Sequence, residues 1–344
     1  MVRLLFWIII ARLPFAVIEA VTQKNVLAGF FQSIWTTIDF GRMEPRWGMK
    51  RVQSVFDHPI LFGVFCSSGL ALTYFVLGHG RPVIVRGARS FLVFLTGCLS
   101  LSSGPLTGMV VQIMLIGWHE TLFWIRERWK ILASLAFAAY LFLELAATRS
   151  PFQVLIALFA FNTSTGFNRI RIWTYTSQSI LDNPLFGIGL NEWNRPSWML
   201  VSVDMFWVVF GLRHGVVAMA AIFVAFFAVL LPLIFRKGLD PRQADYRLGL
   251  VFCLIAFFLT GWTVHYWNAT YALFMFLLGS GAWLLDAEPD RFPADPATGR
   301  RSARPQRQPR GPRHPADPTA PPAAPAAGPA RGPRPWRGRL GSGP

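Results

Sequence analysis

Long runs of apolar residues constrain the fold of this chain more than any other feature. A helix of about 20 apolar residues crosses the roughly 30 Å hydrocarbon core of a membrane and satisfies its own backbone hydrogen bonds there. The sequence therefore predicts an all-α polytopic membrane protein with about eight transmembrane helices. Runs of this length lie at residues 3–20, 59–77, 105–123, 131–147, 206–235, 248–264 and 269–285, and a shorter run lies at 90–102.

Composition supports the membrane class and excludes nucleic acid as a partner. The chain is 53% hydrophobic and only 15% charged, and its mean hydropathy is +0.41. Its net charge of +16 is divided between a basic tail and short connections between apolar runs. This distribution is the one that membrane insertion favours, with Lys and Arg kept on the cytoplasmic side.

The basic connections also predict the orientation. Three of them, near residues 81–89, 126–130 and 236–247, lie on one side if the chain crosses the membrane eight times. Placing them in the cytoplasm puts two long loops, 21–58 and 148–203, on the opposite, periplasmic face. We therefore expect a multi-pass protein of the bacterial inner membrane.

Two regions of different character divide the chain. Residues 1–289 hold the apolar runs and are expected to form one transmembrane domain. Residues 290–344 are rich in Pro, Arg and Ala, bury no apolar surface, and are expected to form a disordered cytoplasmic tail. The run at 3–20 has no convincing signal-peptide cleavage site, so it is interpreted as a span.

The second long loop carries a patterned polar segment. Arg169, Arg171 and Trp173 begin a stretch, 169–182, whose apolar spacing predicts a short amphipathic helix lying on the membrane surface. The breaker Asp-Asn-Pro ends it at Pro184. Gly187 and Gly189 then permit a tight turn or the close approach of a ligand.

The first long loop contributes a second group of cations, among them Arg46 and Arg51. Arginines from two loops on one face suit a diphosphate, because each guanidinium donates paired, charge-assisted hydrogen bonds. The chain has no phosphate-binding glycine loop and no Asp-x-Asp pair for Mg²⁺, so neither a metal nor a cofactor is expected.

Further ionisable residues are expected at the outer interface. If Arg236 marks the inner end of the long run 206–235, then Arg213 and His214 lie near its outer end. Arg171 and Arg213 are therefore expected to bind the diphosphate together with Arg46, Arg51 and Arg169. His265 ends the next span on the same face, and Asp204 directly precedes the long run.

The same segments carry a resemblance to a known family. Arg169-x-x-x-Trp173, the Asn-Pro-Leu-x-Gly-x-Gly motif at 183–189, the segment 51–63 and the Ser-Leu-Ser-Ser-Gly run at 100–104 resemble the O-antigen ligase and polymerase superfamily of bacterial membrane glycosyltransferases. The similarity covers roughly residues 40–285. It implies a metal-independent enzyme that transfers a glycan from an undecaprenyl-diphosphate-linked donor to a lipid A-core or glycan acceptor. The resemblance also implies that Arg51 and Arg169 bind the donor diphosphate.

The chain departs from the family pattern in two ways. Family members usually begin the helix after the long loop with His-Asn, and the His is the expected catalytic residue. Here Asp204 and Met205 occupy that place, so Asp204 is the candidate base, with His214 or His265 as alternatives. The chain also has fewer spans at its N-terminus, as a truncated family member would.

Two other functions stay open from the sequence. The chain could carry polysaccharide or lipid across the membrane without catalysis, or it could be a non-catalytic subunit of an assembly complex. The expected partners are the lipid-linked glycan donor, its acceptor and membrane lipids.

Overall fold

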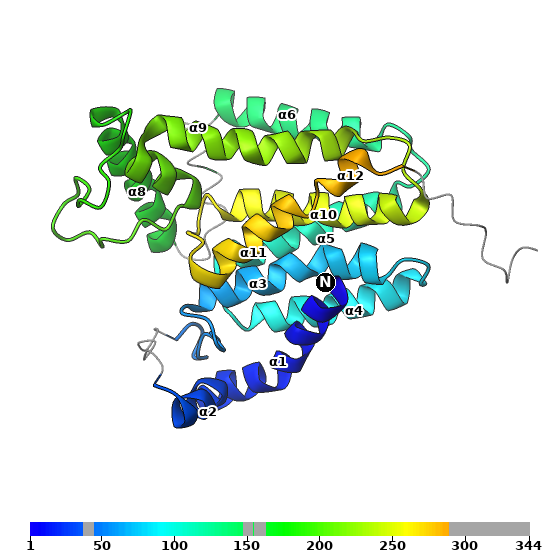
Figure 1. Cartoon of the computed structure of the whole chain (residues 1–344), viewed down its shortest axis with the longest axis horizontal. Coiled ribbons are helices and arrows are strands. Elements are labelled where there is room, and N and C mark those ends of the chain that lie inside the picture. The colour runs from blue at the N-terminus through cyan, green and yellow to red at the C-terminus, as the bar shows by residue number, and fades with distance from the viewer. Residues whose placement is uncertain (37–44, 147–153, 155–162, 289–344) are drawn as a thin grey trace, which may run out of the picture. The chain divides into compact units, whose positions relative to one another are not determined.

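Every regular element in the described part of the chain is a helix. The computed structural model describes residues 1–36, 45–146, 154 and 163–288, and it has no strand in these residues. The predicted tail, 290–344, and parts of both long loops lie outside them. In chain order the helices are α1 (Val2–Thr22), α2 (Val26–Ile34), α3 (Pro59–Leu72) continued by the π-helical turn η1 (Thr73–Leu77), α4 (Val83–Cys98), α5 (Ser103–Thr121), α6 (Arg128–Ala146), α8 (Thr163–Asp182), α9 (Phe206–Phe235), α10 (Pro241–Thr260), α11 (Asn268–Gly279) and α12 (Trp283–Asp286) (Figure 1).

The structure confirms the prediction of a helical membrane protein. Among the described residues, six helical segments are long and apolar enough to cross a membrane: α1, α3 with η1, α6, α9, α10, and α11 with α12. The remaining two predicted runs also form helices, α4 and α5, but α4 has only 16 residues and α5 carries more polar side chains. The count of eight crossings stays a prediction.

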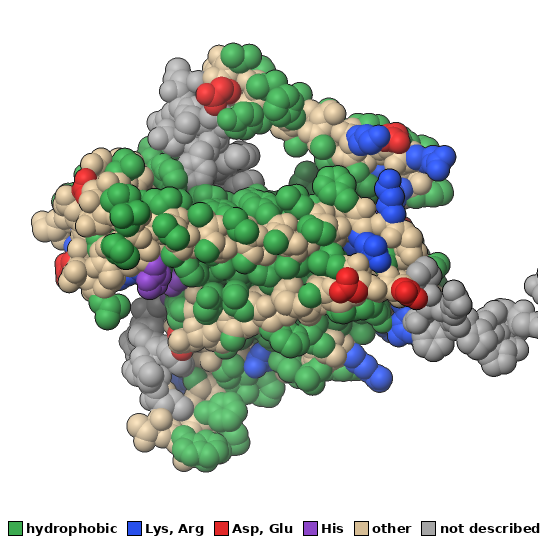
Figure 2. Space-filling view, turned by 45° about the horizontal axis from the view of Figure 1, so that its top comes forward, with side chains coloured by type: hydrophobic (Ala, Val, Ile, Leu, Met, Phe, Trp, Pro, Cys, Tyr) green, Lys and Arg blue, Asp and Glu red, His purple; other side chains and the backbone are tan. Residues whose placement is uncertain are grey.

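The two ends of the helix bundle differ in character. The α3–α4, α5–α6 and α9–α10 connections lie at one end, and α8, α2 and the segment before α3 lie at the other (Figure 1). Lys and Arg side chains gather at the end that holds the α9–α10 connection (Figure 2). This is the segregation of basic connections from long loops that the sequence predicts.

Helix α3 lies at the centre of the bundle, packed against α4, α5 and α10. Small residues let the helices approach closely: a Cβ on Gly63 of α3 would lie 2.8 Å from Pro105 Cβ of α5. The fully buried Gln112 joins α5 to α3, because its Nε2 donates to Ser67 O at 2.9 Å and its Oε1 accepts from Ala71 N at 3.0 Å. A buried amide is tolerated in an apolar interior only when it is bonded in this way.

Helix α9 is broken one third of the way along its length. Gly215 has φ +85° and ψ 174°, a conformation that only glycine adopts readily. The break frees backbone groups that a regular helix would pair. Val216 N instead donates to Pro184 O at 2.7 Å, and Leu212 O accepts from Ile188 N at 2.8 Å. The segment after α8 thus completes the hydrogen bonds of the broken helix.

The glycines of this segment explain how it reaches α9. Gly187 has φ +66°, and a Cβ there would lie 2.6 Å from Leu212 O. Gly189, at φ +62°, donates its N–H to Arg213 O at 3.0 Å. Both glycines take the left-handed conformation that a tight turn requires. The close approach at Gly187 is to the backbone of α9.

Helix α8 ends at Asp182 as predicted, but it begins earlier than predicted, at Thr163. Part of its apolar side packs against protein, while Leu181 is exposed. Ile172 and Ile180 are buried in a cluster with Val208 of α9. The helical spacing of the apolar residues is the same whether the helix covers lipid or another helix, so spacing alone does not distinguish the two.

Candidate functional site

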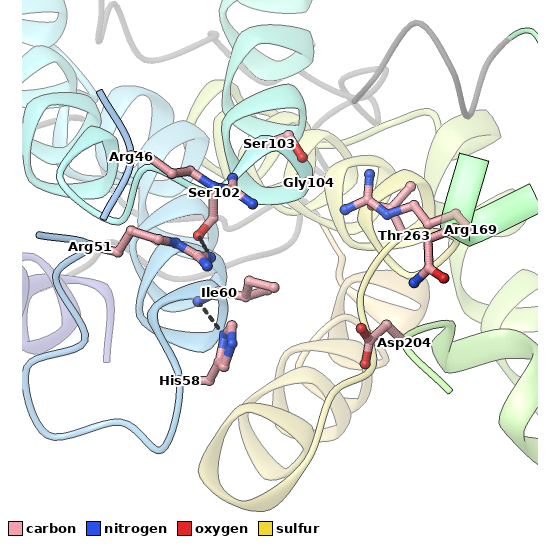
Figure 3. Close-up of a pocket in the computed structure, with 11 residues that line it drawn as sticks. Arg46, Arg51, His58, Ile60, Ser102, Ser103, Gly104, Arg169, Asp204 and Thr263 are labelled. Carbon is pink, nitrogen blue, oxygen red and sulfur yellow. Dashed lines mark hydrogen bonds between the residues drawn. The ribbon is translucent and has the colours of Figure 1, made fainter. Parts of the chain in front are cut away.

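A cavity of about 180 Å³ lies at the end of the bundle opposite the basic connections. Segments far apart in the sequence enclose it: the stretch before α3, the start of α5, a turn of α8, and the loops that precede α9 and follow α10. Arg46 and Arg51 face Arg169 and Asp204 across it (Figure 3). The described residues that line it are Arg46, Arg51, His58, Ile60, Ser102, Ser103, Gly104, Asn168, Arg169, Asp204 and Thr263.

Arg51 is 8% exposed and is fixed by the start of α5. Its Nη2 donates to Ser102 Oγ at 2.9 Å, while its Nε has no hydrogen-bond partner among the described residues. Burial, together with the positive charge of Arg46, lowers the pKa of Arg51 to about 10. The side chain therefore stays charged at neutral pH.

A buried carboxylate in α1 holds the backbone around Arg51 in place. Glu19, only 2% exposed, accepts hydrogen bonds from Gln53 N at 3.2 Å and from Ser54 N at 3.1 Å. Lys50 Nζ lies 4.0 Å from the same carboxylate. Glu19 thus positions the residues on both sides of Arg51, although its place within an apolar run gave no sign of this role.

Arg169 enters the cavity from α8 and is 6% exposed. Its Nη1 is buried and has no hydrogen-bond partner in the described part of the chain. Burial lowers its pKa to about 10, while Asp204 raises it and Arg46 lowers it further. Arg46 is less buried, and its Nη1 donates to Leu101 O at 2.8 Å. Three guanidinium groups therefore share one small cavity.

Asp204 is the carboxylate that lines the cavity. It is half-buried and directly precedes α9. That helix is anchored where it begins, because Phe206 N donates to Gly261 O at 2.8 Å and to Val264 O at 3.1 Å. Burial raises the pKa of Asp204, whereas Arg169 and a hydrogen bond from Ser202 lower it. The carboxylate is an accessible proton acceptor beside cations.

Several predicted site residues lie elsewhere. Arg171 places its guanidinium carbon 5.1 Å from the ring centre of Trp198. Arg213 Nη1 donates to Gly189 O at 2.8 Å and to Asn191 O at 3.1 Å, so it holds the loop after α8. Neither arginine lines the cavity. The prediction that they bind the same ligand as Arg51 is not supported by their positions.

The two alternative histidines are also outside the cavity lining. His214 is exposed on α9. His265 packs against Phe206 and Trp267, and its Nδ1 is buried without a partner among the described residues. Burial, with the charge of Arg213, lowers the pKa of His265 to about 4. Trp173 has an architectural place, since its ring lies 6.3 Å from that of Trp262.

Some residues of the site were not singled out from the sequence. His58 and the start of α5 lie within the two segments that carry the family resemblance, yet neither was assigned a role. Asn168 adjoins Arg169, and Thr263 adjoins the loop of His265. Their positions beside predicted residues were the available signal. The lining residues missed are His58, Ile60, Ser102, Ser103, Gly104, Asn168 and Thr263.

The arrangement suits an anion with several acceptor oxygens. Among the described residues of the lining, three are arginines and Asp204 is the one carboxylate. No group of three His, Cys, Asp or Glu side chains suited to a metal occurs in the part of the chain that the structure describes. No protein-family model, curated protein or solved structure matches the chain.

Proposed function

We propose that the chain is a membrane glycosyltransferase that polymerises or ligates an oligosaccharide carried on undecaprenyl diphosphate. The observation that carries this proposal is the meeting of Arg46, Arg51 and Arg169 in one cavity, from segments more than a hundred residues apart. Guanidinium groups bind phosphate oxygens through charge-assisted hydrogen bonds. The donor's diphosphate occupies the cavity, and its lipid lies in the adjoining membrane.

Unpartnered nitrogens on the arginines support an anionic ligand. Arg51 Nε and Arg169 Nη1 are buried and bonded to no described residue. Leaving a buried donor unbonded costs about 1–3 kcal/mol, and more when the group is charged. A diphosphate has acceptor oxygens enough to bond both nitrogens at once, which removes this cost when it binds.

The start of α5 adds backbone donors. Ser103 and Gly104, its first two residues, line the cavity. Ser102 does not cap the helix, because its hydroxyl donates to Ser100 O and accepts from Arg51. The N–H groups of a helix N-terminus carry partial positive charge and bind phosphate in many proteins.

Asp204 is the proposed general base. It removes the proton from an acceptor hydroxyl, whose oxygen then bonds to the anomeric carbon of the donor sugar as the bond from that carbon to the diphosphate breaks. The leaving diphosphate takes the electron pair of the broken bond. Arg46, Arg51 and Arg169 stabilise the negative charge that develops on it. Burial raises the pKa of Asp204, which makes its carboxylate a stronger base.

Helix length supports a site at the outer membrane surface. The part of α9 from Gly215 to Phe235 is about 30 Å long at 1.5 Å per residue, equal to the hydrocarbon thickness. Basic residues follow Phe235 and belong on the cytoplasmic side. Asp204 precedes Gly215, which supports the proposal that the cavity lies at the periplasmic boundary of a bacterial inner membrane, where lipid-linked donors are used.

Transfer by the purified protein in proteoliposomes tests the proposal. With a lipid-linked oligosaccharide donor, Arg169→Ala is expected to lower the transfer rate by at least about 100-fold, the loss of one charge-stabilising group. Arg171→Ala is the matched control, because Arg171 lies on the same helix outside the cavity lining. Equal activity of both variants and the parent contradicts the proposal. Movement of intact donor across the membrane, with no glycosidic bond formed, identifies a transporter instead.

A further inference from the structure

His58 lies at the start of α3, on the wall of the cavity beside Arg51 (Figure 3). It is the N-cap residue of that helix: Ile60 N donates a hydrogen bond to its Nδ1 at 3.1 Å. Trp267 packs against the ring with its centre 6.2 Å away. The imidazole is thereby held in one orientation, with its other nitrogen, Nε2, not engaged by the cap.

The cap fixes the tautomer of the ring. A nitrogen that accepts a hydrogen bond has no proton of its own, so Nδ1 is unprotonated. The single proton of a neutral imidazole is then on Nε2, which is a donor. A ring held in this state has no free lone pair, because Nδ1 is occupied by Ile60 N–H.

The surroundings also keep the ring neutral. Burial is the largest cause, and the positive charges of Arg51 and Arg46 add to it, so that the pKa of His58 is lowered to about 4. At neutral pH the ring is uncharged, and the cavity gains a hydrogen-bond donor without a fourth positive charge. The imidazole N–H of His58 is thus a second kind of hydrogen-bond donor in the cavity lining, beside the guanidinium groups.

We propose that His58 binds the donor diphosphate directly, through a hydrogen bond from Nε2–H to a phosphate oxygen, and that it takes no proton during the reaction. This inference rests on the proposed function, because it assumes the same anionic ligand. His58 therefore selects for a ligand that carries an acceptor oxygen at the α3 side of the cavity. Because His58 takes no proton, Asp204 remains the proton acceptor among the described side chains of the lining.

Two substitutions separate the cap from the donor. The amide of Asn coincides with the position of Nδ1, so His58→Asn keeps a good helix cap but removes the group at Nε2. The amide nitrogen of Gln coincides with Nε2, so His58→Gln keeps a donor there but caps the helix poorly. A purely structural histidine and a ligand-binding histidine respond to this pair in opposite ways.

The experiment measures binding of inorganic pyrophosphate to the purified full chain in lipid nanodiscs by calorimetry, with the melting temperature followed in parallel. His58→Asn is expected to bind pyrophosphate about 10- to 100-fold more weakly, the loss of one hydrogen bond to a charged group, with a nearly unchanged melting temperature. His58→Gln is expected to melt a few degrees lower, about 2–4 °C, yet to bind within about threefold of the parent.

The outcomes distinguish this inference from the proposed function. Binding by His58→Asn equal to that of the parent overturns the role of His58, as does weakening by His58→Gln as large as that by His58→Asn. In both cases the arginine cavity still binds pyrophosphate and the proposed function stands. Failure of the parent to bind pyrophosphate, or binding that Arg51→Ala leaves unchanged, overturns the proposed function and this inference together.

Discussion

Removing the carboxylate of Glu19 is expected to release the segment that carries Arg51 while the helix bundle stays folded. Two backbone donors, Gln53 N and Ser54 N, bond this buried carboxylate at 3.2 and 3.1 Å. A hydrogen bond to a charged group stabilises by about 1.5–3 kcal/mol, so the loss of both in Glu19→Ala is expected to destabilise the segment by about 3–6 kcal/mol. The contact from Lys50 at 4.0 Å is partly exposed and adds little.

Hydrogen–deuterium exchange measures this effect at the place where it occurs. In the parent, the amides of Gln53 and Ser54 are protected by Glu19, and in Glu19→Ala they are expected to exchange at least about 100-fold faster, since 1.4 kcal/mol corresponds to a factor of ten. The affinity of Glu19→Ala for pyrophosphate is also expected to fall, because Arg51 loses its fixed position. Peptides from α10, which Glu19 does not contact, serve as the internal reference.

Glu19→Gln is the graded control. Its single amide oxygen bonds one of the two N–H groups, and its amide nitrogen faces the other as a second donor, so an intermediate exchange rate is expected. The reasoning is refuted if Glu19→Ala leaves the exchange of residues 53–54 and the affinity for pyrophosphate unchanged. It is equally refuted if exchange rises to the same extent in α10, since that result means global destabilisation.

Two further predictions follow from the break in α9 and from the cavity. Gly215→Ala is expected to lower the free energy of unfolding by about 3 kcal/mol or more, and the melting temperature with it, because the new Cβ lies 2.2 Å from Leu185 O at φ +85°. In Gly189→Ala the new Cβ has nothing within 4 Å, so this variant is expected to lose only about 1–2 kcal/mol, from its left-handed backbone. For Asp204, burial raises the pKa above its usual 3.8, so the transfer rate is expected to fall as the pH drops through this raised pKa, where the carboxylate gains a proton. Asp204→Asn is expected to abolish transfer at every pH. If this variant still transfers, and its rate falls at acidic pH as that of the parent does, Asp204 is not the base.

The sequence predicted most helices because their signal is local. Each apolar run forms a helix, and α8 ends at the Asp-Asn-Pro breaker. The two arginine segments were also predicted to face one ligand, and Arg51 and Arg169 do share a cavity. Their cationic character and loop placement are properties that a linear sequence displays.

Features that depend on contacts across the chain could not be predicted in this way. The break at Gly215 lies within the long apolar run 206–235, directly after Arg213 and His214, and a segment almost thirty residues upstream supplies the missing hydrogen-bond partners. Arg213 was assigned to the ligand because it is a cation near the outer interface, yet its actual acceptors are backbone carbonyls of that same segment. Charge alone does not reveal whether an arginine binds a ligand or a loop.

The cavity gives a physical reason for our proposal that the base at position 204 is a carboxylate, where the sequence resemblance implies an imidazole. Excess positive charge and burial both favour the neutral form of histidine, and they lower the pKa of His58 to about 4. An imidazole beside Arg169 would meet the same influences and be a weak base. For Asp204 the two influences oppose one another, since burial raises its pKa while Arg169 lowers it. Burial thus raises the basicity of the Asp204 carboxylate where it would lower that of an imidazole, and for this reason we propose aspartate as the proton acceptor beside these arginines.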